Sequence, residues 1–415
     1  MNTSQFPIAW VRDSFPVLNN GEKFVFFDNG AGAQVPQTVL DAVQHHLVSR
    51  NVQRGGRYRQ SQEVDQAIQS ARESVATFLN AREAAEVAFG MNATSFIRIV
   101  SQAIGENIRD RGEIIVSDLD HEANVATWLD LQRRGFEIRW WKMREDGTLH
   151  TSDLEPLLNS RTRLVACTVA SNALGSIVNV KEVAHMARAV GAEVFLDAVH
   201  YAPHGPIDVQ DLDCDYLVCS GYKIFAPHMG FVWGKREALE ALPTFREDFI
   251  PNQVPMKIEV GTFVYENVAG MDAAIGYLEQ LGTRVGPDAQ GSRRDRLVQV
   301  MEAIRAYEAS LSLELIKQLS ALDSATVYGV SDPLKINERV PTVCFNLRGI
   351  APSTISEKCA AAGIGVRDGN MYSPRLLRRL HIPLDTGAVR ASLVHYNTVD
   401  EIHQFVDVLR RIGRD

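Results

Sequence analysis

Short runs of apolar, β-branched and aromatic residues alternate with helical patterns through the first two thirds of the chain. Because a helix between two such runs returns the chain to the same end of a sheet, this alternation predicts a mostly parallel sheet covered by helices. Most of the runs are apolar throughout rather than alternating, which indicates strands buried on both faces. The predicted strands are EVAFG (86–90), EIIVS (113–117), EIRWW (137–141), RLVACTV (163–169), EVFLDAV (193–199) and DYLVCS (215–220).

A seventh run, GFVWG (230–234), follows DYLVCS too closely for a crossover helix. We therefore expect it to enter antiparallel, which gives a mostly parallel seven-stranded sheet. The chain has 415 residues, of which 45% are hydrophobic and 23% charged, enough for two or three domains with sizeable cores.

The pattern changes after about residue 285. A long charged helical pattern over residues 293–319 precedes short strands such as TVCFNL (342–347) and VRASLV (389–394), which predicts a smaller α+β domain. The segment GPDAQGSRRDR (286–296) combines Gly, Pro and charge without apolar periodicity and is the expected boundary. The expected parts are an N-terminal arm over 1–25 that packs on the small domain, a large domain over 26–285 and a small C-terminal domain over 286–415.

The net charge of -8 argues against a general affinity for nucleic acid or acidic membranes and favours a small-molecule partner. No run approaches the roughly 18 apolar residues that span a bilayer, and the N-terminus lacks a signal-peptide pattern, so we expect a cytoplasmic protein. The cysteines are odd in number and show no metal-ligand spacing, which indicates reduced thiols and no metal site. They are Cys167, Cys214, Cys219, Cys344 and Cys359.

Two residues at predicted strand ends suggest cofactor chemistry. Lys223 lies in SGYKIFAP (220–227), directly after a strand, and Asp197 ends the strand EVFLD. Carboxyl ends of parallel strands meet at one edge of a sheet, where a desolvated lysine becomes a usable nucleophile. A lysine imine and an acid facing the pyridine nitrogen are what pyridoxal 5′-phosphate (PLP) requires. The alternatives are a surface lysine in a turn and an aspartate that caps a helix.

Eight segments, taken in order, resemble class V aminotransferase-type PLP enzymes and, among them, the cysteine desulfurase and selenocysteine lyase group. The resemblance covers nearly the whole chain and implies PLP-dependent transferase fold type I. The segments are FFDNGAGAQVP (26–36), NVQRG (51–55), DLDHEANVATW (118–128), ASNALGSIVNV (170–180), LDAVHYAPH (196–204), SGYKIFAP (220–227), IEVGT (258–262) and VRASLVHYN (389–397).

This resemblance assigns residues to the cofactor ring. Lys223 would form the Schiff base, Asp197 would face the pyridine nitrogen and His121 would stack on the ring. Asn172 and His200 would hydrogen-bond the phenolic oxygen, although the desulfurases usually carry Gln where this chain has His200. A helix-cap or surface position is the alternative for His121.

The phosphate would lie where GMNATSF (90–96) turns from strand to helix. Its donors would be the backbone N–H groups of Ala93 and Thr94 and the hydroxyls of Thr94, Ser220 and Tyr222. Tyr222 replaces a histidine that the family usually has beside the lysine. The alternative for Thr94 is a simple N-cap without a ligand.

For the substrate, the resemblance implies that Arg390 binds the α-carboxylate, with Arg367 and Arg54 as secondary candidates. The alternative for Arg390 is a surface arginine on an edge strand. A threonine matching Thr262 reaches the phosphate of the neighbouring subunit in this family. The resemblance therefore implies a homodimer with shared active sites.

The chain departs from the desulfurases in the loop GVRDGNMYSPRLL (365–377), where Tyr372 stands in place of the cysteine that carries the persulfide. Cys359 is the nearest cysteine along the chain, in a helical pattern, and is expected to be a buried small hydrophobe. A phenol cannot form a persulfide. Gln53, where the desulfurase pattern has His, also indicates a changed acid–base arrangement.

We therefore expect a PLP enzyme acting on an amino acid, with Lys223, His121 and Tyr372 as catalytic residues. The favoured reaction is β-elimination by a carbon–sulfur lyase, in which Tyr372 serves as an acid toward the leaving group. The alternatives are a class V aminotransferase, an amino-acid epimerase or racemase, and a non-catalytic sulfur-relay partner. Retention of Lys223, Asp197, His121 and Arg390 speaks against the last.

Overall fold

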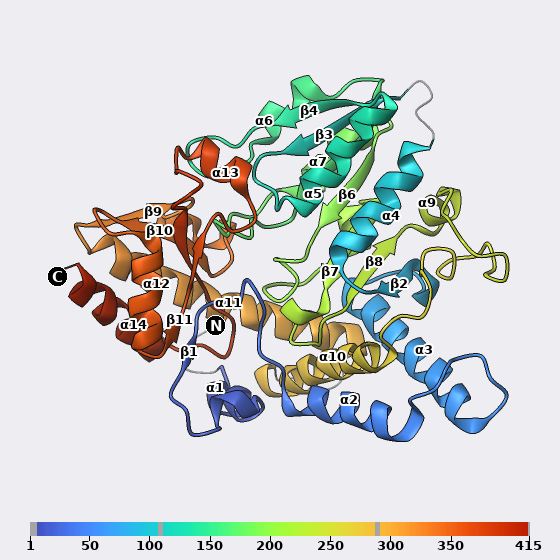
Figure 1. Ribbon diagram of the computed structural model, residues 1–415, viewed down its shortest axis with the longest axis horizontal. Helices are drawn as coiled ribbons and strands as arrows, with labels where there is room; N and C mark the ends of the chain where they lie inside the picture. The colour runs from blue at the N-terminus through green and yellow to red at the C-terminus, as the bar shows by residue number, and fades with distance from the viewer. Residues whose placement is uncertain (1–5, 107–110, 287–290, 414–415) are drawn as a thin grey trace.

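The computed structural model describes residues 6–106, 111–286 and 291–413. Figure 1 shows two lobes, one built around a large sheet and the other containing the C-terminal part of the chain. Helix α11 (Arg293–Ser320) contacts α3 and α10 in the first lobe and α14 and β9 in the second, so it joins the two. None of the described helices is long and apolar enough to cross a membrane.

The large sheet has the seven strands that the sequence predicted, in the order β2-β8-β7-β6-β5-β3-β4. All neighbouring pairs are parallel except those of β8, which runs antiparallel to β2 and β7, so the expectation for GFVWG is also confirmed. The edge strand β4 is the least buried of the seven, because only its last residue, Trp141, is buried. The strands are β2 (Val87–Gly90), β3 (Glu113–Ser117), β4 (Glu137–Trp141), β5 (Thr162–Thr168), β6 (Glu193–Asp197), β7 (Tyr216–Ser220) and β8 (Gly230–Gly234).

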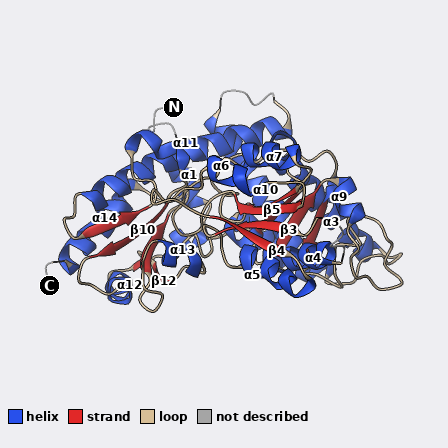
Figure 2. Ribbon diagram, turned by 90° about the horizontal axis from the view of Figure 1, so that it is seen from above, coloured by secondary structure: helices blue, strands red, loops and turns tan. Residues whose placement is uncertain are grey.

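Alternate residues of one strand enter two separate hydrophobic cores. Val194 and Leu196 of β6 belong to the core beneath α3, α7 and α10, whereas Phe195 points into the core beneath α4 and α5. This is why the central strands are apolar without alternation. Figure 2 shows the sheet between these two helical layers. The helices are α2 (Gln37–Arg50), α3 (Arg59–Leu79), α4 (Ala93–Gly105), α5 (Ala123–Leu129), α6 (Thr151–Leu154), α7 (Val180–Ala189), α8 (Val209–Leu212), α9 (Arg236–Ala241) and α10 (Tyr265–Val285).

The second lobe, which we call the small lobe in contrast to the large lobe around the seven-stranded sheet, is an antiparallel sheet packed against helices. Its strand order is β12-β13-β10-β9. Its long helices begin with complete capping boxes, Ser292 with Asp295 in α11 and Thr398 with Glu401 in α14, which fix where they start. The remaining elements are β9 (Ala325–Tyr328), β10 (Thr342–Leu347), α12 (Pro352–Ala361), β11 (Ile364–Gly365), β12 (Arg367–Gly369), α13 (Pro374–Arg379), β13 (Ala388–Ser392) and α14 (Val399–Ile412).

The N-terminal segment contacts both lobes. In α1 (Ile8–Asp13), Arg12 pairs with Glu401 of α14 at 2.8 Å, while Trp10 stacks on Tyr277 of α10. The strand β1 (Val25–Phe26) then pairs with β11 of the second lobe. The arm therefore lies over the junction, and the domain limits remain a prediction. Part of the expected boundary, residues 287–290, lies outside the described residues.

Candidate active site

Three parallel strands end side by side at one edge of the large sheet. Thr168 of β5 is in register with Asp197 of β6, and β7 beside them ends at Ser220. A 3₁₀ turn, η6 (Gly221–Lys223), follows and brings Lys223 to the same edge. Ligands of open α/β sheets bind at such carboxyl ends, so this edge is the natural place for a site.

Lys223 is buried, with 7% of its surface exposed, which excludes the surface-lysine interpretation. Burial is the main reason that the pKa of its amine falls to about 8, and the nearby charge of Arg390 lowers it further. Asp197 and Asp28 act in the opposite direction but do not compensate. A sizeable fraction of this amine is therefore neutral and nucleophilic near neutral pH.

Asp197 is also buried, and its Oδ1 accepts a hydrogen bond from the N–H of Val199 at 2.9 Å. No regular helix starts there, so the helix-cap interpretation is wrong. Burial raises the pKa of this carboxyl group, while the Val199 hydrogen bond and the charge of Lys223 partly oppose the rise. A cationic ring nitrogen beside it would favour the ionised form.

The N-terminus of α4 supplies the anion-binding part. Its cap is Asn92, whose side chain accepts from the N–H of Ser95 at 2.9 Å, so the N-cap interpretation of Thr94 is wrong. Ala93 and Thr94 are the first two helical residues, where backbone N–H groups lack intrahelical partners. Gly230 lies against this turn so closely that a Cβ there would fall 2.4 Å from the carbonyl carbon of Asn92.

His121 follows β3 and closes the cavity on another side. Its Nδ1 accepts from the N–H of Ala123 at 3.1 Å, and burial together with the charges of Lys223 and Arg390 lowers its pKa to about 4. The ring is therefore neutral, as a flat stacking group should be. The ring of Tyr372 lies 5.7 Å from it, centroid to centroid, at a tilt of 37°.

These groups enclose one cavity, which we call the inner cavity. It combines a buried amine, a buried carboxyl group, a helix N-terminus with hydroxyls, and a neutral imidazole, the donor set that an aromatic aldehyde phosphate needs. The residues present fit PLP. The cavity is lined by Asn92, Ala93, Thr94, Ile97, His121, Ala123, Thr168, Asn172, Asp197, Val199, His200, Ser220, Tyr222 and Lys223.

Asn172 lines the inner cavity, but its amide is engaged elsewhere. Its Nδ2 donates to the carbonyl of Met371 at 2.7 Å, and its Oδ1 accepts from the hydroxyl of Ser373 at 3.0 Å. Asn172 therefore holds the loop that carries Tyr372, and only its second N–H remains for a ligand. The resemblance had assigned this amide only to the phenolic oxygen.

The two arginines expected at the substrate carboxylate share one partner that the sequence reasoning missed. Asp28 accepts from Arg390 Nη2 at 3.0 Å and from Arg367 Nη2 at 2.7 Å. Arg390 is 1% exposed, which excludes the surface-arginine interpretation, and its Nη1 donates to the carbonyl of Asn172. The signal for Asp28 was the same as for Asp197, an aspartate that directly follows an apolar run.

Gln53, Arg54 and Thr262 do not line the inner cavity. Gln53 contacts Thr262 at 3.4 Å, and Arg54 pairs with Asp65 at 3.3 Å and Glu259 at 3.7 Å. They form a separate, solvent-accessible cluster. Three exposed apolar side chains, Met91, Phe245 and Val260, line one surface groove, and Val260 is two positions from Thr262.

Tyr372 projects from a tightly anchored loop. Its neighbours Met371 and Ser373 are buried, whereas Tyr372 is 58% exposed, and both Met371 and Tyr372 have positive φ angles. Non-glycine residues rarely adopt that conformation, and buried anchors on both sides maintain it here. All five cysteines are free and buried, including Cys359 in α12 as expected. No thiol therefore lies on this loop.

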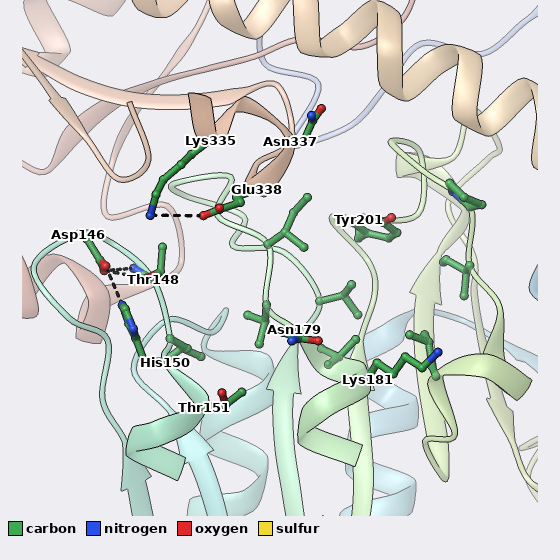
Figure 3. Close-up of a pocket in the computed structure, with 18 of the residues that line it drawn as sticks. Asp146, Thr148, His150, Thr151, Asn179, Lys181, Tyr201, Lys335, Asn337 and Glu338 are labelled. Atoms are coloured by element: carbon green, nitrogen blue, oxygen red, sulfur yellow. Dashed lines mark hydrogen bonds and ion pairs between the residues drawn. The ribbon is translucent and has the colours of Figure 1, made fainter. Parts of the chain in front are cut away.

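A wider cavity, the outer cavity, has a volume of about 580 Å³ and lies between the large-lobe loops and the 3₁₀ segment η7 (Pro333–Glu338). Figure 3 shows two pairs of its polar side chains in contact: His150 with Asp146 at 2.7 Å and Lys335 with Glu338 at 3.8 Å. None of the residues predicted for the active site lines it. Size alone would therefore have pointed away from the residues that the sequence predicted.

Comparison with known proteins gives the same assignment. The class-V aminotransferase family profile matches residues 25–405. A probable cysteine desulfurase of Synechocystis sp. is 32% identical over 421 residues, covering 97% of this chain and 94% of that protein. An aminotransferase-like protein of Gibberella zeae is 32% identical over 422 residues, covering 99% of this chain and all of the other, 100%. The structure of the cysteine desulfurase CsdA of Escherichia coli, 26% identical, superimposes with a TM-score of 0.84 over 98% of both chains.

The fold and the inner cavity define a PLP-dependent enzyme of fold type I. The chain belongs to the class V aminotransferase family and is of the cysteine desulfurase type.

Proposed function

We propose that this enzyme is a carbon–sulfur lyase that eliminates the β-substituent of a cysteine-derived amino acid. The observation that carries the proposal is a complete inner cavity around Lys223 combined with a loop that presents Tyr372 and no thiol. In the overall reaction, the Cα–H and Cβ–S bonds break, and water releases the nitrogen. The products are a thiol or sulfide, pyruvate and ammonium.

The cofactor, when bound, supplies an electron sink for the carbanion at Cα. Lys223 would hold it, with Asp197 facing its ring nitrogen and His121 lying on its ring. Its phosphate would lie at the N-terminus of α4, near the hydroxyls of Thr94, Ser220 and Tyr222. His200 and the free N–H of Asn172 would donate to its phenolic oxygen.

The substrate groups follow from the remaining residues. Arg390 and Arg367 would bind the α-carboxylate, for which planar guanidinium groups are well suited. Lys223 would take the Cα proton, because its lowered pKa lets the neutral amine act as a base near neutral pH. The phenol of Tyr372 would donate a proton to the leaving sulfur; its hydroxyl has no partner among the described residues.

We also propose a homodimer with shared active sites. Thr262 lies outside the inner cavity of its own chain, and the exposed side chains of Met91, Phe245 and Val260 line one groove that a second copy would cover. Gln53 and Arg54, beside Thr262, would then face the partner's site. Size-exclusion chromatography with light scattering tests this, and a monomer at micromolar concentration would contradict it.

A second candidate is an aminotransferase or epimerase reaction, which also needs no thiol on the loop. It is favoured by the similarity to the aminotransferase-like protein of Gibberella zeae. The two candidates differ in the fate of the side chain, because only elimination releases it.

The deciding experiment incubates the PLP-loaded enzyme with L-cysteine and S-substituted cysteines and measures pyruvate and thiol release. We expect pyruvate in proportion to thiol, and Tyr372→Phe should lower the rate about tenfold, mostly for thiols that leave as poor anions. Cofactor conversion to the amine form, or Cα deuterium exchange with the side chain retained, would instead support the second candidate. Tyr372→Cys tests whether the loop lacks only its nucleophile, since persulfide on that cysteine would be detected by mass spectrometry.

A further inference from the structure

One residue of the inner cavity is held by the other lobe. His200, in the turn after β6, contacts Thr342 of β10 through Nε2 and Oγ1 at 2.9 Å. Thr342 is completely buried and His200 is 3% exposed, so water does not compete for this hydrogen bond. The small-lobe sheet therefore touches the cavity wall directly.

The direction of this hydrogen bond follows from burial. The only partner of the Thr342 hydroxyl in the described part of the chain is His200. If Nε2 donated instead, the buried O–H would have no acceptor, whereas an N–H on Nδ1 can be satisfied from the cavity that His200 lines. The hydroxyl therefore donates and His200 Nε2 accepts. Nε2 consequently carries no proton.

His200 is neutral, so its single proton is on the other ring nitrogen, Nδ1. Burial is the main cause that keeps its pKa well below 6.5, and the nearby basic groups, Lys223 first among them, lower it further. A neutral imidazole has one donor and one acceptor nitrogen, and the bond made by one nitrogen fixes the role of the other. The groups that face it are Lys223, His204, Arg390 and His121, with Glu308 of α11 behind His204.

The ring of His200 is also fixed in orientation. The ring of His204 packs against it edge to face at 5.6 Å, and Glu308 holds His204 Nδ1 at 2.8 Å. On another side, Gly30 packs closely against the ring, since a Cβ there would fall 3.1 Å from His200 Cε1. Nδ1 has no partner among the described residues, and it is the nitrogen left to face a ligand.

We infer that Thr342 is a positioning residue that sets the tautomer of His200, so that Nδ1–H donates to the phenolic oxygen of bound PLP. The inference rests on the proposed contact between His200 and the cofactor. The family's usual Gln would donate through its amide whatever its neighbour does, whereas a histidine needs its proton assigned. Thr342 makes that assignment, and it does so from the small lobe.

The test measures the absorbance of the PLP-loaded protein as a function of pH in Thr342→Val and Thr342→Ser. A donor to the phenolic oxygen stabilises its anion and makes the adjoining imine nitrogen less basic. Thr342→Val removes the donor that fixes the tautomer, so the pH midpoint of the spectral change should rise by about one unit. Thr342→Ser keeps the hydroxyl and should titrate like the unaltered protein. Equal midpoints in all three proteins would overturn the inference.

A double-mutant cycle separates positioning from a general structural effect. In a His200→Gln background, Thr342→Val should leave the midpoint unchanged, because the amide needs no assigned tautomer. A shift that persists in that background would contradict the inference. If no PLP absorbance develops in the unaltered protein, the proposed function itself fails. Nitrogen-15 NMR of histidines in the unaltered protein gives an answer without any threonine variant, since His200 Nε2 should resonate as an unprotonated nitrogen and a protonated Nε2 would refute the inference.

Discussion

The inner and outer cavities contain similar residue types in opposite circumstances. In the inner cavity, Lys223 and Asp197 are buried, and neither forms an ion pair with another described residue. In the outer cavity, Lys181 and Lys335 are more than half exposed, and each is paired with a carboxylate. Exposed ion pairs contribute little to stability. Buried titratable groups without a charged partner are destabilising, and they occur typically at functional sites, where a ligand supplies the partner. Titratable groups, rather than volume, therefore identify the site.

The largest effect on activity should come from replacing Lys223 of the inner cavity, with a replacement of Lys335 in the outer cavity as the control. Among the described residues, Lys223 is the one lysine that lines the inner cavity. In Lys223→Ala the absorbance of covalently bound PLP should therefore be lost, and turnover should fall by at least about 10³-fold. Lys335→Ala, in the outer cavity, should change neither. Absorbance after gel filtration and pyruvate release are the measurements. Equal losses in both variants would remove the distinction between the cavities.

A smaller effect is expected from the arginine that joins the inner cavity to the small lobe. Arg390→Lys keeps a positive charge but cannot reproduce the fork that contacts Asp28 and the carbonyl of Asn172. We expect KM for the amino acid to rise about 10- to 100-fold, with a smaller change in kcat. Arg236→Lys, at an exposed arginine of α9 that pairs with Glu83 and Glu240 and does not line the inner cavity, is the matched control. A fall in kcat alone would show that Arg390 does not bind the carboxylate.

The pH dependence of cofactor uptake offers the mildest test. Only the neutral amine attacks the aldehyde, and with a pKa of about 8 its neutral fraction rises as pH increases and is half complete near pH 8. Uptake of PLP by the cofactor-free protein should therefore accelerate about tenfold between pH 7 and 9 and then level off. Stopped-flow absorbance measures the rate. A rate still rising steeply above pH 10 would indicate an ordinary lysine.

The sequence predicted the strand-end part of the site well because chain direction alone places it. Once six runs were recognised as parallel strands, Thr168, Asp197 and Ser220 had to meet at one edge. Asp28 escaped notice because its contacts with Arg367 and Arg390 join residues more than 300 positions apart along the chain. Thr342 carried no signal, since a threonine at the start of an apolar strand is ordinary.

The contacts of Asn172, Gln53 and Thr262 also depended on tertiary packing. Asn172 matched a ligand-binding position, yet both its amide nitrogen and its amide oxygen form hydrogen bonds with the loop at 370–373. Gln53 and Thr262 looked like site residues, and in the folded chain they contact each other at a distance from the inner cavity.

The amino-acid sequence by itself determined the sheet, the placement of Lys223 beside Asp197 and the absence of a thiol between positions 365 and 377. These follow from local periodicity, chain direction and residue identity. Tertiary structure alone decided the tautomer of His200, the shared clamp on Asp28 and the pKa of Lys223. Each depends on burial and on partners from the other lobe, and the sequence does not show which groups lose contact with water when the chain folds.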